Sequence, residues 1–377
     1  MQKIKFGVPI SLSGRYAIQG RESFEGLTLW VKDVNESGGI FVREYGKKLP
    51  VEFLHYDDQS SADRCKEFVE QLLLDDKVDV LIGPYSSGLT LAAAPIAEGF
   101  KKILWNHGGS SDGIFEKGVT YVVSAITPAS SYFTGIIEMV KKIDKEARKI
   151  VIFRAEDSGF STNVAEGAKR CGEENGFLIT ELEYSSGTQD FSPLLKQAQE
   201  SIPDLILGVG RAEDDVLLAR QIIQRKVDAK AIGLVVASIK YFKEILEQDA
   251  EGFLSTSQWE CGIKIEPDLG PTPQGFLDRF KDIYSKEPDY TAAQSYNIGL
   301  VIQKCIEDAG TLDDYDLREA ASRADFKSFY GHFKVDPTTG KQIGHKMVIV
   351  QWRNGSKLIV YPEDVAQASP AYPKLIS

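Results

Sequence analysis

Two short loops hold the residues of this 377-residue sequence whose types and spacing are best suited to chemistry. Residues 82–88 read Ile-Gly-Pro-Tyr-Ser-Ser-Gly, and residues 105–112 read Trp-Asn-His-Gly-Gly-Ser-Ser-Asp. Serine hydroxyls and the N–H groups that begin a helix can together hold an anion, most simply a carboxylate. Glycines let the backbone come close to a ligand. A helix cap or a turn would explain one such loop, but two loops on consecutive strands favour a binding site.

Sequence motifs of enzymes are absent. There is no GxGxxG after the first strand, no GxxxxGK[ST], no GxSxG and no HExxH, and the four histidines show no metal-ligand spacing. Asp57, Asp58 and His107 are the candidates for acid–base chemistry. A carboxylate pair at a strand end, however, more often lies in a solvated loop or at the start of a helix. We therefore predict that the protein is not an enzyme and uses no cofactor and no metal.

The composition disfavours several classes of partner. The 44 basic and 55 acidic residues give a net charge of −11, which argues against binding to nucleic acid or to an anionic membrane surface. No apolar run approaches the ~18 residues that a membrane span needs. The cysteines have no CxxC spacing and are too few for a disulfide scaffold, so they are either free or form one distant pair. They are Cys65, Cys171, Cys261 and Cys305.

The elements that must position the two loops alternate between strand and helix. Such alternation predicts α/β lobes with parallel central sheets and helices on both faces. Both loops then follow the carboxyl ends of strands, where open α/β sheets bind their ligands. The expected strands are 3–9, 51–56, 79–83 and 103–106, and, after a restart near residue 125, 149–153, 177–184, 204–209 and 231–237.

The last third of the chain breaks this pattern. Helices are expected at 274–284 and 292–308, followed by strand-like segments. Asn354-Gly355 lies between two of these strands, at 346–352 and 357–361, and predicts a hairpin. Because no third βαβ run and no linker follow, we expect this part to add pieces to both lobes through several short crossings.

The chain resembles the extracytoplasmic solute-binding proteins of ABC importers for branched-chain amino acids. The resemblance runs in order through nearly the whole sequence and implies the type I periplasmic binding protein fold, with two doubly wound lobes, three crossings and a ligand cleft that closes by a hinge. The implied lobes are 1–125 with 254–336, and 126–253 with 337–377. The matching stretches include Phe6–Gly14, Gly20, Phe24–Gly26, Asp33–Ile40, Asp57-Asp58, Val80–Pro84 with Ser86-Ser87, Tyr296, Gly299, Phe333–Asp336 and Gly340.

The resemblance also implies ligand contacts in the first lobe. A ligand carboxylate would lie on Ser87, Gly109 and Ser110, with Ser86 next to them. Three further residues are expected to line the wall of the site: Gln19, Tyr85 and Asn106.

The second lobe departs from the family pattern. Ser158 stands where a tyrosine usually stacks over the ligand, and Val235 or Val236 stands where an acid usually accepts the ligand's ammonium group. Arg211 follows the strand 204–209, and an unpaired arginine in a closed cleft would call for an anionic partner.

Two interpretations of the ligand therefore stay open. In the first, the ligand keeps a carboxylate but lacks the usual amino group, or carries a second anionic or carbonyl group towards Arg211, so that an aliphatic or aromatic acid, a dicarboxylate or an amide would fit. In the second, the ligand is an amino acid. In the second case another acid supplies the ammonium contact, and Arg211 faces solvent or pairs with Glu156, Glu213 or Asp214.

The predicted function is a receptor that captures a small solute by lobe closure and delivers it to a membrane permease. We expect a monomeric periplasmic or extracytoplasmic protein whose signal or lipoprotein segment has been removed, because residues 1–3 lead directly into a strand. The alternative is a ligand-sensing regulator on the same fold, of the amide-sensor type.

Overall fold

The protein, described here by a computed structural model for residues 2–116 and 118–374, forms two compact units. Unit 1 comprises Met1–Pro128 and Cys261–Lys346, and unit 2 comprises Ala129–Glu260 and Met347–Ser377. The chain therefore passes from one unit to the other three times. The last third contributes to both units, as the sequence predicts.

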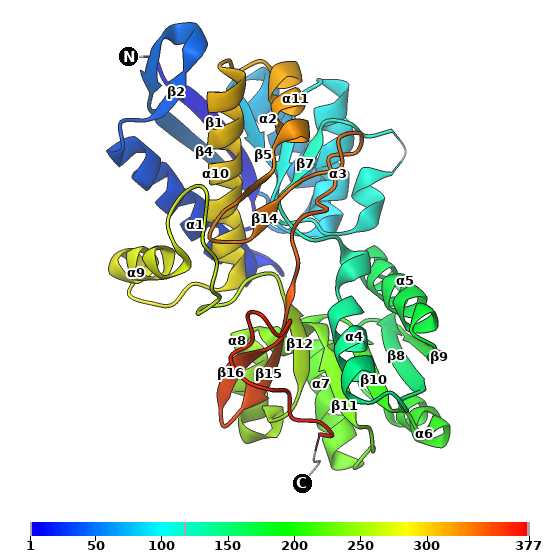
Figure 1. Cartoon of the computed structure of the whole chain (residues 1–377). Coiled ribbons are helices and arrows are strands. Elements are labelled where there is room, and N and C mark those ends of the chain that lie inside the picture. Colours follow the sequence, from blue (N-terminus) through cyan, green and yellow to red (C-terminus); the bar gives the residue numbers. More distant parts are fainter. Residues whose placement is uncertain (1, 117, 375–377) are drawn as a thin grey trace. The chain divides into compact units, whose positions relative to one another are not determined.

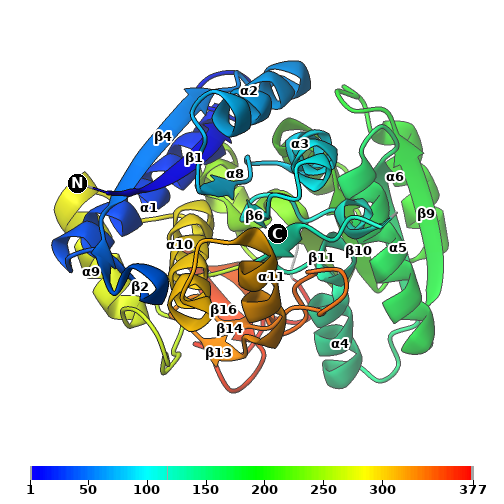
Figure 2. The same cartoon turned by 90° about the horizontal axis from the view of Figure 1, so that it is seen from above.

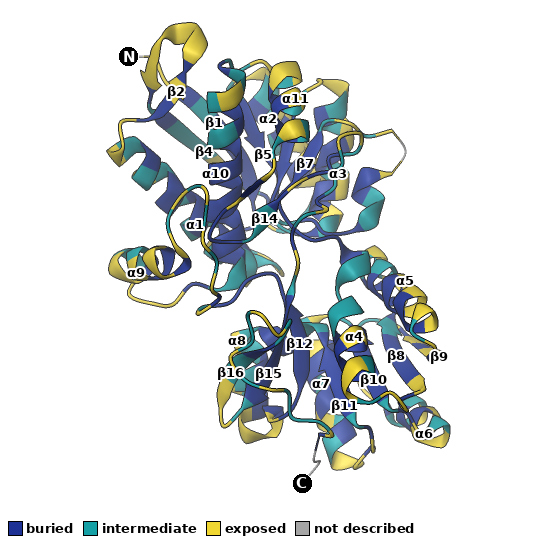
Figure 3. Ribbon diagram, viewed as in Figure 1, coloured by how far each residue is buried: buried dark blue, intermediate teal, exposed yellow. Residues whose placement is uncertain are grey.

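Unit 1 is built on a sheet of five parallel strands in the order β4-β1-β5-β6-β7 (Figure 1). Strands β1, β5, β6 and β7 are mostly buried (Figure 3) and mostly apolar, whereas the edge strand β4 is only partly buried and carries polar residues. Their bounds are β1 Ile4–Ile10, β4 Val51–Asp57, β5 Val80–Ile82, β6 Leu104–Asn106 and β7 Val122–Ser124, and two short hairpins lie outside this sheet, β2 Ile40–Val42 with β3 Lys47–Leu49 and β13 Phe326–Lys327 with β14 His332–Phe333.

Helices cover both faces of this sheet (Figure 2). One face carries α2 and α3, and the other carries α1 and α10, which pack so closely that a Cβ at Gly26 would lie 2.1 Å from the carbonyl oxygen of Ala292. Helix α1 ends before Gly38 and Gly39, whose φ angles of 89° and 97° are typical of the glycines that follow a helix. The helices are α1 Ala17–Glu36, α2 Ala62–Leu74, α3 Ser87–Gly99, α9 Pro273–Tyr284, α10 Tyr290–Ala309 and α11 Asp314–Arg323, with the 3-10 turns η1 Arg43–Tyr45 and η2 Asp112–Phe115.

Unit 2 has a seven-stranded sheet in the order β16-β15-β12-β11-β10-β8-β9. Strands β8 to β12 are parallel, and β15 and β16 extend them in antiparallel fashion. The hairpin predicted at Asn354-Gly355 is confirmed, since Arg353 pairs with Ser356 across it. The strands are β8 Lys149–Ala155, β9 Leu178–Tyr184, β10 Leu205–Val209, β11 Ala231–Leu234, β12 Leu254–Ser257, β15 Val348–Arg353 and β16 Ser356–Tyr361.

Two apolar cores flank the sheet of unit 2. One is formed with α4 and α5, and the other with α6, α7 and α8. The fold class predicted from the alternating pattern, parallel sheets with helices on both faces, is confirmed in both units. The helices are α4 Thr134–Ile143, α5 Gly159–Glu174, α6 Ser192–Ser201, α7 Ala212–Gln224 and α8 Lys240–Leu246, with the 3-10 turns η3 Ala129–Ser131, η4 Val235–Ser238 and η5 Glu247–Ala250.

Each boundary between the two units lies a few residues further along the chain than the boundary inferred from the sequence. Residues 254–257, expected in the first lobe, form β12 in unit 2, because this strand completes the sheet between β11 and β15. Residues 337–346, expected in the second lobe, belong to unit 1, where the Ser124 N–H donates to the Gly340 carbonyl (3.0 Å). Among the described residues no helix has the length and apolar character needed to cross a membrane.

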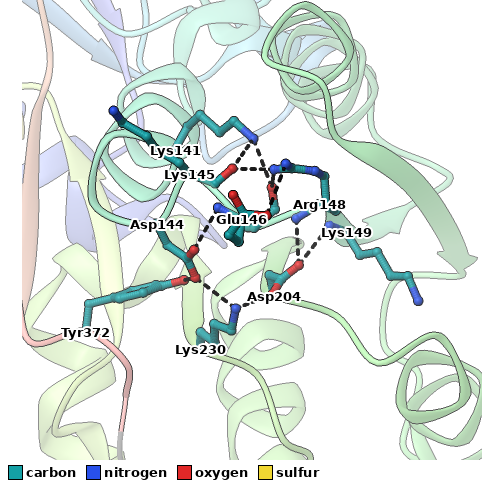
Figure 4. Close-up of polar contacts among 10 residues, drawn as sticks. Lys141, Asp144, Lys145, Glu146, Arg148, Lys149, Asp204, Lys230 and Tyr372 are labelled. Carbon is teal, nitrogen blue, oxygen red and sulfur yellow. Dashed lines mark hydrogen bonds and ion pairs between the residues drawn. The ribbon is translucent and has the colours of Figure 1, made fainter.

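A lysine bridges two carboxylates at the amino-terminal edge of the unit 2 sheet (Figure 4). Lys230 Nζ lies 2.8 Å from Asp144 Oδ2 and 2.7 Å from Asp204 Oδ1. The Tyr372 hydroxyl also donates to Asp144 Oδ2 (2.8 Å), and the Lys374 N–H donates to the Lys230 carbonyl (2.7 Å). These contacts fasten the C-terminal segment to the unit.

Replacing Lys230 by methionine should lower the free energy of unfolding by about 1 kcal/mol near neutral pH. The hydrogen bonds from Lys230 and Tyr372 hold the pKa of Asp144 at about 2. The stability that Asp144 contributes is therefore present above its unfolded pKa, near 4, and is lost as the pH falls towards 2. Hydrogen bonds to the two carboxylates raise the pKa of Lys230, so its contribution persists up to its unfolded pKa and is lost at higher pH.

Urea titrations at several pH values would check this expectation, with Lys196→Met, an exposed lysine of α6, as the matched control. The difference between Lys230→Met and the unsubstituted protein should be constant around neutral pH and should shrink below pH 4. Equal stability of the two proteins at pH 7 would show that the bridge contributes nothing.

Candidate carboxylate-binding site

The two serine- and glycine-rich loops lie side by side at the carboxyl-terminal edge of the unit 1 sheet. They follow the neighbouring parallel strands β5 and β6. Tyr85 forms a bridge with Gly108, and the Ser86 N–H donates to the Gly108 carbonyl (3.2 Å). A Cβ at Gly108 would lie 2.6 Å from Tyr85 Cα. This glycine therefore lets the two loops approach one another.

The Ser87 hydroxyl connects the two loops by accepting hydrogen bonds, and its own proton remains available for donation. Its Oγ accepts the backbone N–H of Ser110 (3.2 Å) and that of Ser111 (3.0 Å). A hydroxyl has two acceptor lone pairs and one donor, so both lone pairs are used. Within residues 2–116 and 118–374 the Ser87 O–H donates to no protein acceptor. An external carboxylate oxygen is the group that this arrangement suits best.

The residue before this hydroxyl has an unusual backbone conformation. Ser86, the N-cap of α3, has φ 100° and ψ 148°. Residues other than glycine rarely adopt this backbone conformation, which costs about 1–3 kcal/mol. Its Oγ accepts the Leu89 N–H (3.3 Å), and its carbonyl accepts the Thr90 hydroxyl (2.9 Å). Ser86 is thus used inside the loop, and the strained turn sets the direction of Ser87.

Asn106 supports the second loop from within. Its Oδ1 accepts the N–H groups of Gly108 (3.2 Å) and Gly109 (2.8 Å), and its Nδ2 donates to the Gly109 carbonyl (2.6 Å) and to Ser124 Oγ (3.1 Å). The prediction that Asn106 lines the wall of the site needs correction, because its amide is buried and fully bonded within unit 1. It is a positioning residue.

Gly109 also differs from its predicted role as a carboxylate anchor. Its N–H already donates to Asn106 Oδ1. A Cβ at this position would lie 2.4 Å from Thr90 Oγ1 and 2.8 Å from Ile114 Cδ1. The missing side chain therefore allows close packing against α3 rather than close approach of a ligand. Ser110, at 5% exposure, follows directly and stays next to Ser87.

Replacing Asn106 by alanine should cost about 2–3 kcal/mol of unfolding free energy, because it leaves buried N–H groups of the loop without acceptors. The matched control is Ser124→Ala, which removes one of the four hydrogen bonds of Asn106 and the longer contacts (3.4 Å) of Ser124 Oγ with the Ile126 backbone, and it should cost less than half as much. Chemical denaturation of both variants measures the difference. If the two variants were equally stable, Asn106 would not hold the loop.

Three tyrosines from distant parts of the chain meet beside the first loop. The Tyr85 hydroxyl lies 3.3 Å from that of Tyr290, and the Tyr85 ring meets the ring of Tyr16 edge-on at 6.2 Å between centroids. Gln19 is half-buried one turn after Tyr16 on α1. The structure thus brings the predicted Tyr85 and Gln19 to one edge, and it adds Tyr16 and Tyr290, which no motif marks.

The candidates for acid–base chemistry have structural roles. Asp57 Oδ1 accepts the Leu12 N–H (2.9 Å), and Asp58 Oδ1 accepts the hydroxyl of Ser11 (2.6 Å), so both hold the loop after β1. Burial acts to raise the pKa of Asp57, but hydrogen bonds led by that from the Ser13 hydroxyl lower it overall. Burial raises the pKa of Asp58.

His107 is buried and bonded towards α10. The Ser295 hydroxyl donates to the Thr291 carbonyl (2.7 Å), so Ser295 Oγ accepts from His107 Nδ1 (3.1 Å). Burial lowers the pKa of His107 to about 4. A neutral ring held in this way supports helix packing and is not positioned as a catalytic base.

In unit 2, the predicted residues Ser158 and Arg211 also lie at the carboxyl-terminal edge of the sheet. They follow the paired strands β8 and β10. Ser158 is the N-cap of α5, and its Oγ accepts the Ser161 N–H (3.2 Å). Ser158 thus has a structural role as the cap of α5.

Arg211 is paired, as one of the two interpretations from the sequence expects, and its backbone N–H donates to Asp214 Oδ2 (3.3 Å). Its Nη2 lies 3.4 Å from Asp157 Oδ2, an acid outside the set expected to pair with it, and both side chains are about half exposed. The Ser186 hydroxyl and, to a smaller extent, the charge of Arg211 lower the pKa of Asp157. The edge of unit 2 therefore presents both signs of charge.

A second acid near this edge does not reach the surface. Asp215 in α7 is fully buried, and its Oδ2 accepts the Val236 N–H (3.4 Å). Burial raises the pKa of Asp215 to about 7. A Cβ at Gly210 would lie 2.0 Å from the Tyr184 hydroxyl, so this glycine makes room for the buried tyrosine.

A family model described as periplasmic binding protein matches residues 3–357. The chain belongs to the periplasmic binding protein family. Its two units have the type I fold of this family, and the resemblance inferred from the sequence is confirmed. Members of the family are solute-binding receptors with an extracytoplasmic location, which agrees with the absence of enzyme motifs.

Individual relatives match this chain over nearly its full length. The Leu/Ile/Val-binding protein homolog 7 of Brucella abortus (strain 2308) is 24% identical over 383 residues, covering 96% of this chain and 92% of that protein. The leucine-binding protein LivK of Thermotoga maritima MSB8 has a TM-score of 0.80 and 24% identity, covering 94% and 97% of the two chains. An ABC-transporter solute-binding protein of R. palustris, solved with 4-hydroxybenzoate, has a TM-score of 0.78 and 21% identity, covering 94% and 95%.

Proposed function

We propose that this protein is the extracytoplasmic receptor of an ABC importer and that it binds a small carboxylate at the edge of unit 1. The observation that carries the proposal is the Ser87 hydroxyl, which accepts two backbone N–H groups and keeps its proton for an external acceptor. Ser110, buried beside it, supplies a second hydroxyl. The anchors are Ser87 and Ser110, with Ser86, Asn106 and Gly109 holding them in position.

The names of the relatives support a ligand that is a branched-chain amino acid or an aromatic acid. One relative is named for leucine, isoleucine and valine, and one solved structure holds 4-hydroxybenzoate. The two ligand types share a carboxylate, which agrees with the anchor at Ser87. In unit 2, the Asp157–Arg211 pair can meet either sign of charge on the rest of the ligand.

Capture proceeds by closure of the second lobe over a ligand that the first lobe already holds. Closure requires that the ligand bind the closed state more tightly than the open state. A permease of the importer then accepts the solute from the closed receptor, which acts as a monomer. The chemistry is that of binding alone, without a bond made or broken.

Isothermal titration of ligand-stripped protein tests the proposal. The panel contains L-leucine, benzoate and 4-hydroxybenzoate, each paired with the amide in which a neutral group replaces the carboxylate: leucinamide, benzamide and 4-hydroxybenzamide. At least one carboxylate should bind at micromolar concentration or tighter, and its amide should bind at least ten-fold more weakly. Equal affinity for acid and amide, or no binding of any acid, would refute the carboxylate proposal.

A further inference from the structure

The first turn of helix α7 ties together three loops at the carboxyl-terminal edge of the unit 2 sheet. Asp214 Oδ1 accepts the Gly187 N–H of the loop after β9 (2.8 Å), and Asp214 Oδ2 accepts the Arg211 N–H of the loop after β10 (3.3 Å). Through Oδ2, Asp215 accepts the Val236 N–H in the turn after β11 (3.4 Å). Two adjacent acids therefore hold the three loops in position.

The other oxygen of Asp215 lacks a partner although it is closed off from water. Asp215 is fully buried, and within the described part of the chain its Oδ1 has neither a hydrogen bond nor an ion pair. The hydroxyl of Tyr184, at the end of β9, is also buried and without a partner there. A Cβ at Gly210 would lie 2.0 Å from this hydroxyl and 3.0 Å from Asp215 Oδ1. The two oxygens therefore face the same small space beside Gly210.

The charges around this space offer no cation to Asp215. The acids that act on it and on the neighbouring hydroxyl are Asp214 and Asp157. Arg211, the cation of this edge, pairs with Asp157, and both side chains are about half exposed. The turn Val235–Ser238 contains no ionisable side chain. An ionised Asp215 would thus be a buried charge without a counter-charge, which a protein interior tolerates poorly.

A proton on Oδ1 removes this charge and finds an acceptor in the same space. A hydroxyl oxygen has two acceptor lone pairs, and those of Tyr184 are unused within the described residues. Burial raises the pKa of Tyr184, so this residue stays a hydroxyl. Burial likewise raises the pKa of Asp215 to about 7, although the hydrogen bond from Val236 acts to lower it. The direction of both shifts agrees with the geometry.

We propose that Asp215 is a positioning residue that carries a proton in the native protein, holding the turn after β11 through Oδ2 and donating from Oδ1 to the Tyr184 hydroxyl. The hydrogen bond joins α7 to β9 and keeps the carboxyl group neutral among acids. Loss of the proton in alkaline solution leaves an unbalanced charge inside unit 2 and lowers the stability of the protein. The inference concerns unit 2 and does not depend on the carboxylate site proposed in unit 1.

Urea titrations at several pH values test this inference on the unsubstituted protein, on Asp215→Asn and on the matched control Asp228→Asn, an exposed acid of the same unit. Asparagine is a neutral isostere whose oxygen can accept the Val236 N–H and whose amide can donate to Tyr184. Because the native pKa of Asp215 lies above its unfolded value near 4, the native state binds more protons, and its stability falls as the pH rises from about 4 to above 7.

Between about pH 5 and pH 8 the ratio of folded to unfolded protein should fall at least about 10-fold more in the unsubstituted protein and in Asp228→Asn than in Asp215→Asn. A general loss of packing would lower the stability of Asp215→Asn equally at every pH and would not flatten its pH profile. Parallel profiles of Asp215→Asn and the unsubstituted protein would overturn the inference.

Infrared spectroscopy provides a second measurement that does not depend on the folding of Asp215→Asn. In mildly acidic solution the unsubstituted protein should show the carbonyl band of a protonated carboxyl group, and this band should disappear in alkaline solution. In Tyr184→Phe the band should move to higher wavenumber, because the carboxyl O–H loses its acceptor. An identical band in folded Tyr184→Phe, or the absence of a titrating band from the unsubstituted protein, would also overturn the inference.

Discussion

Replacing Ser87 by leucine should weaken binding of the carboxylate ligand by at least about 100-fold. The substitution removes the O–H that we propose donates to the ligand, and a hydrogen bond to a charged group contributes about 1.5–3 kcal/mol. It also removes the acceptor of the Ser110 and Ser111 N–H groups, so the second loop loses its tie to α3. The larger side chain then occupies the space of the carboxylate.

Two further variants separate these causes. Ser87→Thr keeps a hydroxyl and should bind within a few-fold of the unsubstituted protein. Gly88→Ala, at the next position, adds a methyl group where nothing lies within 4 Å, and should bind normally. Isothermal titration gives the affinities, and circular dichroism shows whether each variant is folded. Retention of full affinity by folded Ser87→Leu would place the carboxylate elsewhere.

Replacing Gly167 by alanine should lower the free energy of unfolding by about 2–3 kcal/mol. In the interior of an exposed helix the same change stabilises by about 1 kcal/mol. Here the new Cβ would lie 1.8 Å from the carbonyl oxygen of Ser130, and a backbone atom cannot move aside as a flexible side chain can. Helix α5 must therefore shift away from the turn Ala129–Ser131, which overpacks the core of unit 2.

Gly159→Ala is the matched control, because Gly159 begins the same helix and its added Cβ would meet nothing within 4 Å. Urea unfolding should show this control to be as stable as the unsubstituted protein or slightly more so. If Gly167→Ala were as stable as Gly159→Ala, helix α5 would not pack closely on Ser130.

Local signals predicted much of the fold. The alternation of apolar strands and amphipathic helices predicted both parallel sheets, and Asn354-Gly355 predicted a hairpin whose two central residues have φ of 51° and 77°. Each of these signals depends on a few consecutive residues, so no knowledge of tertiary contacts is needed to read it.

Features that depend on contacts between distant segments were missed. Strand β12 reads Leu-Ser-Thr-Ser, a sequence that marks neither lobe, and its pairing with β11 and β15 assigns it to unit 2. Asn106 has the polarity of a ligand contact, but its amide makes three hydrogen bonds inside the loop and a fourth to Ser124 in β7. Asp157 and Arg211 are 54 residues apart, and Tyr85 and Tyr290 are 205 apart. No local pattern relates such pairs.

The most direct test of the central claim is a crystal structure of this protein with the tightest-binding acid of the titration panel. The carboxylate should lie with one oxygen about 2.5–3.0 Å from Ser87 Oγ, the range of a hydroxyl that donates to an anion. The Ser110 and Ser111 N–H groups should still donate to the other side of that hydroxyl. A carboxylate bound away from Ser87, or a Ser87 hydroxyl that donates to a protein acceptor in the complex, would contradict the account.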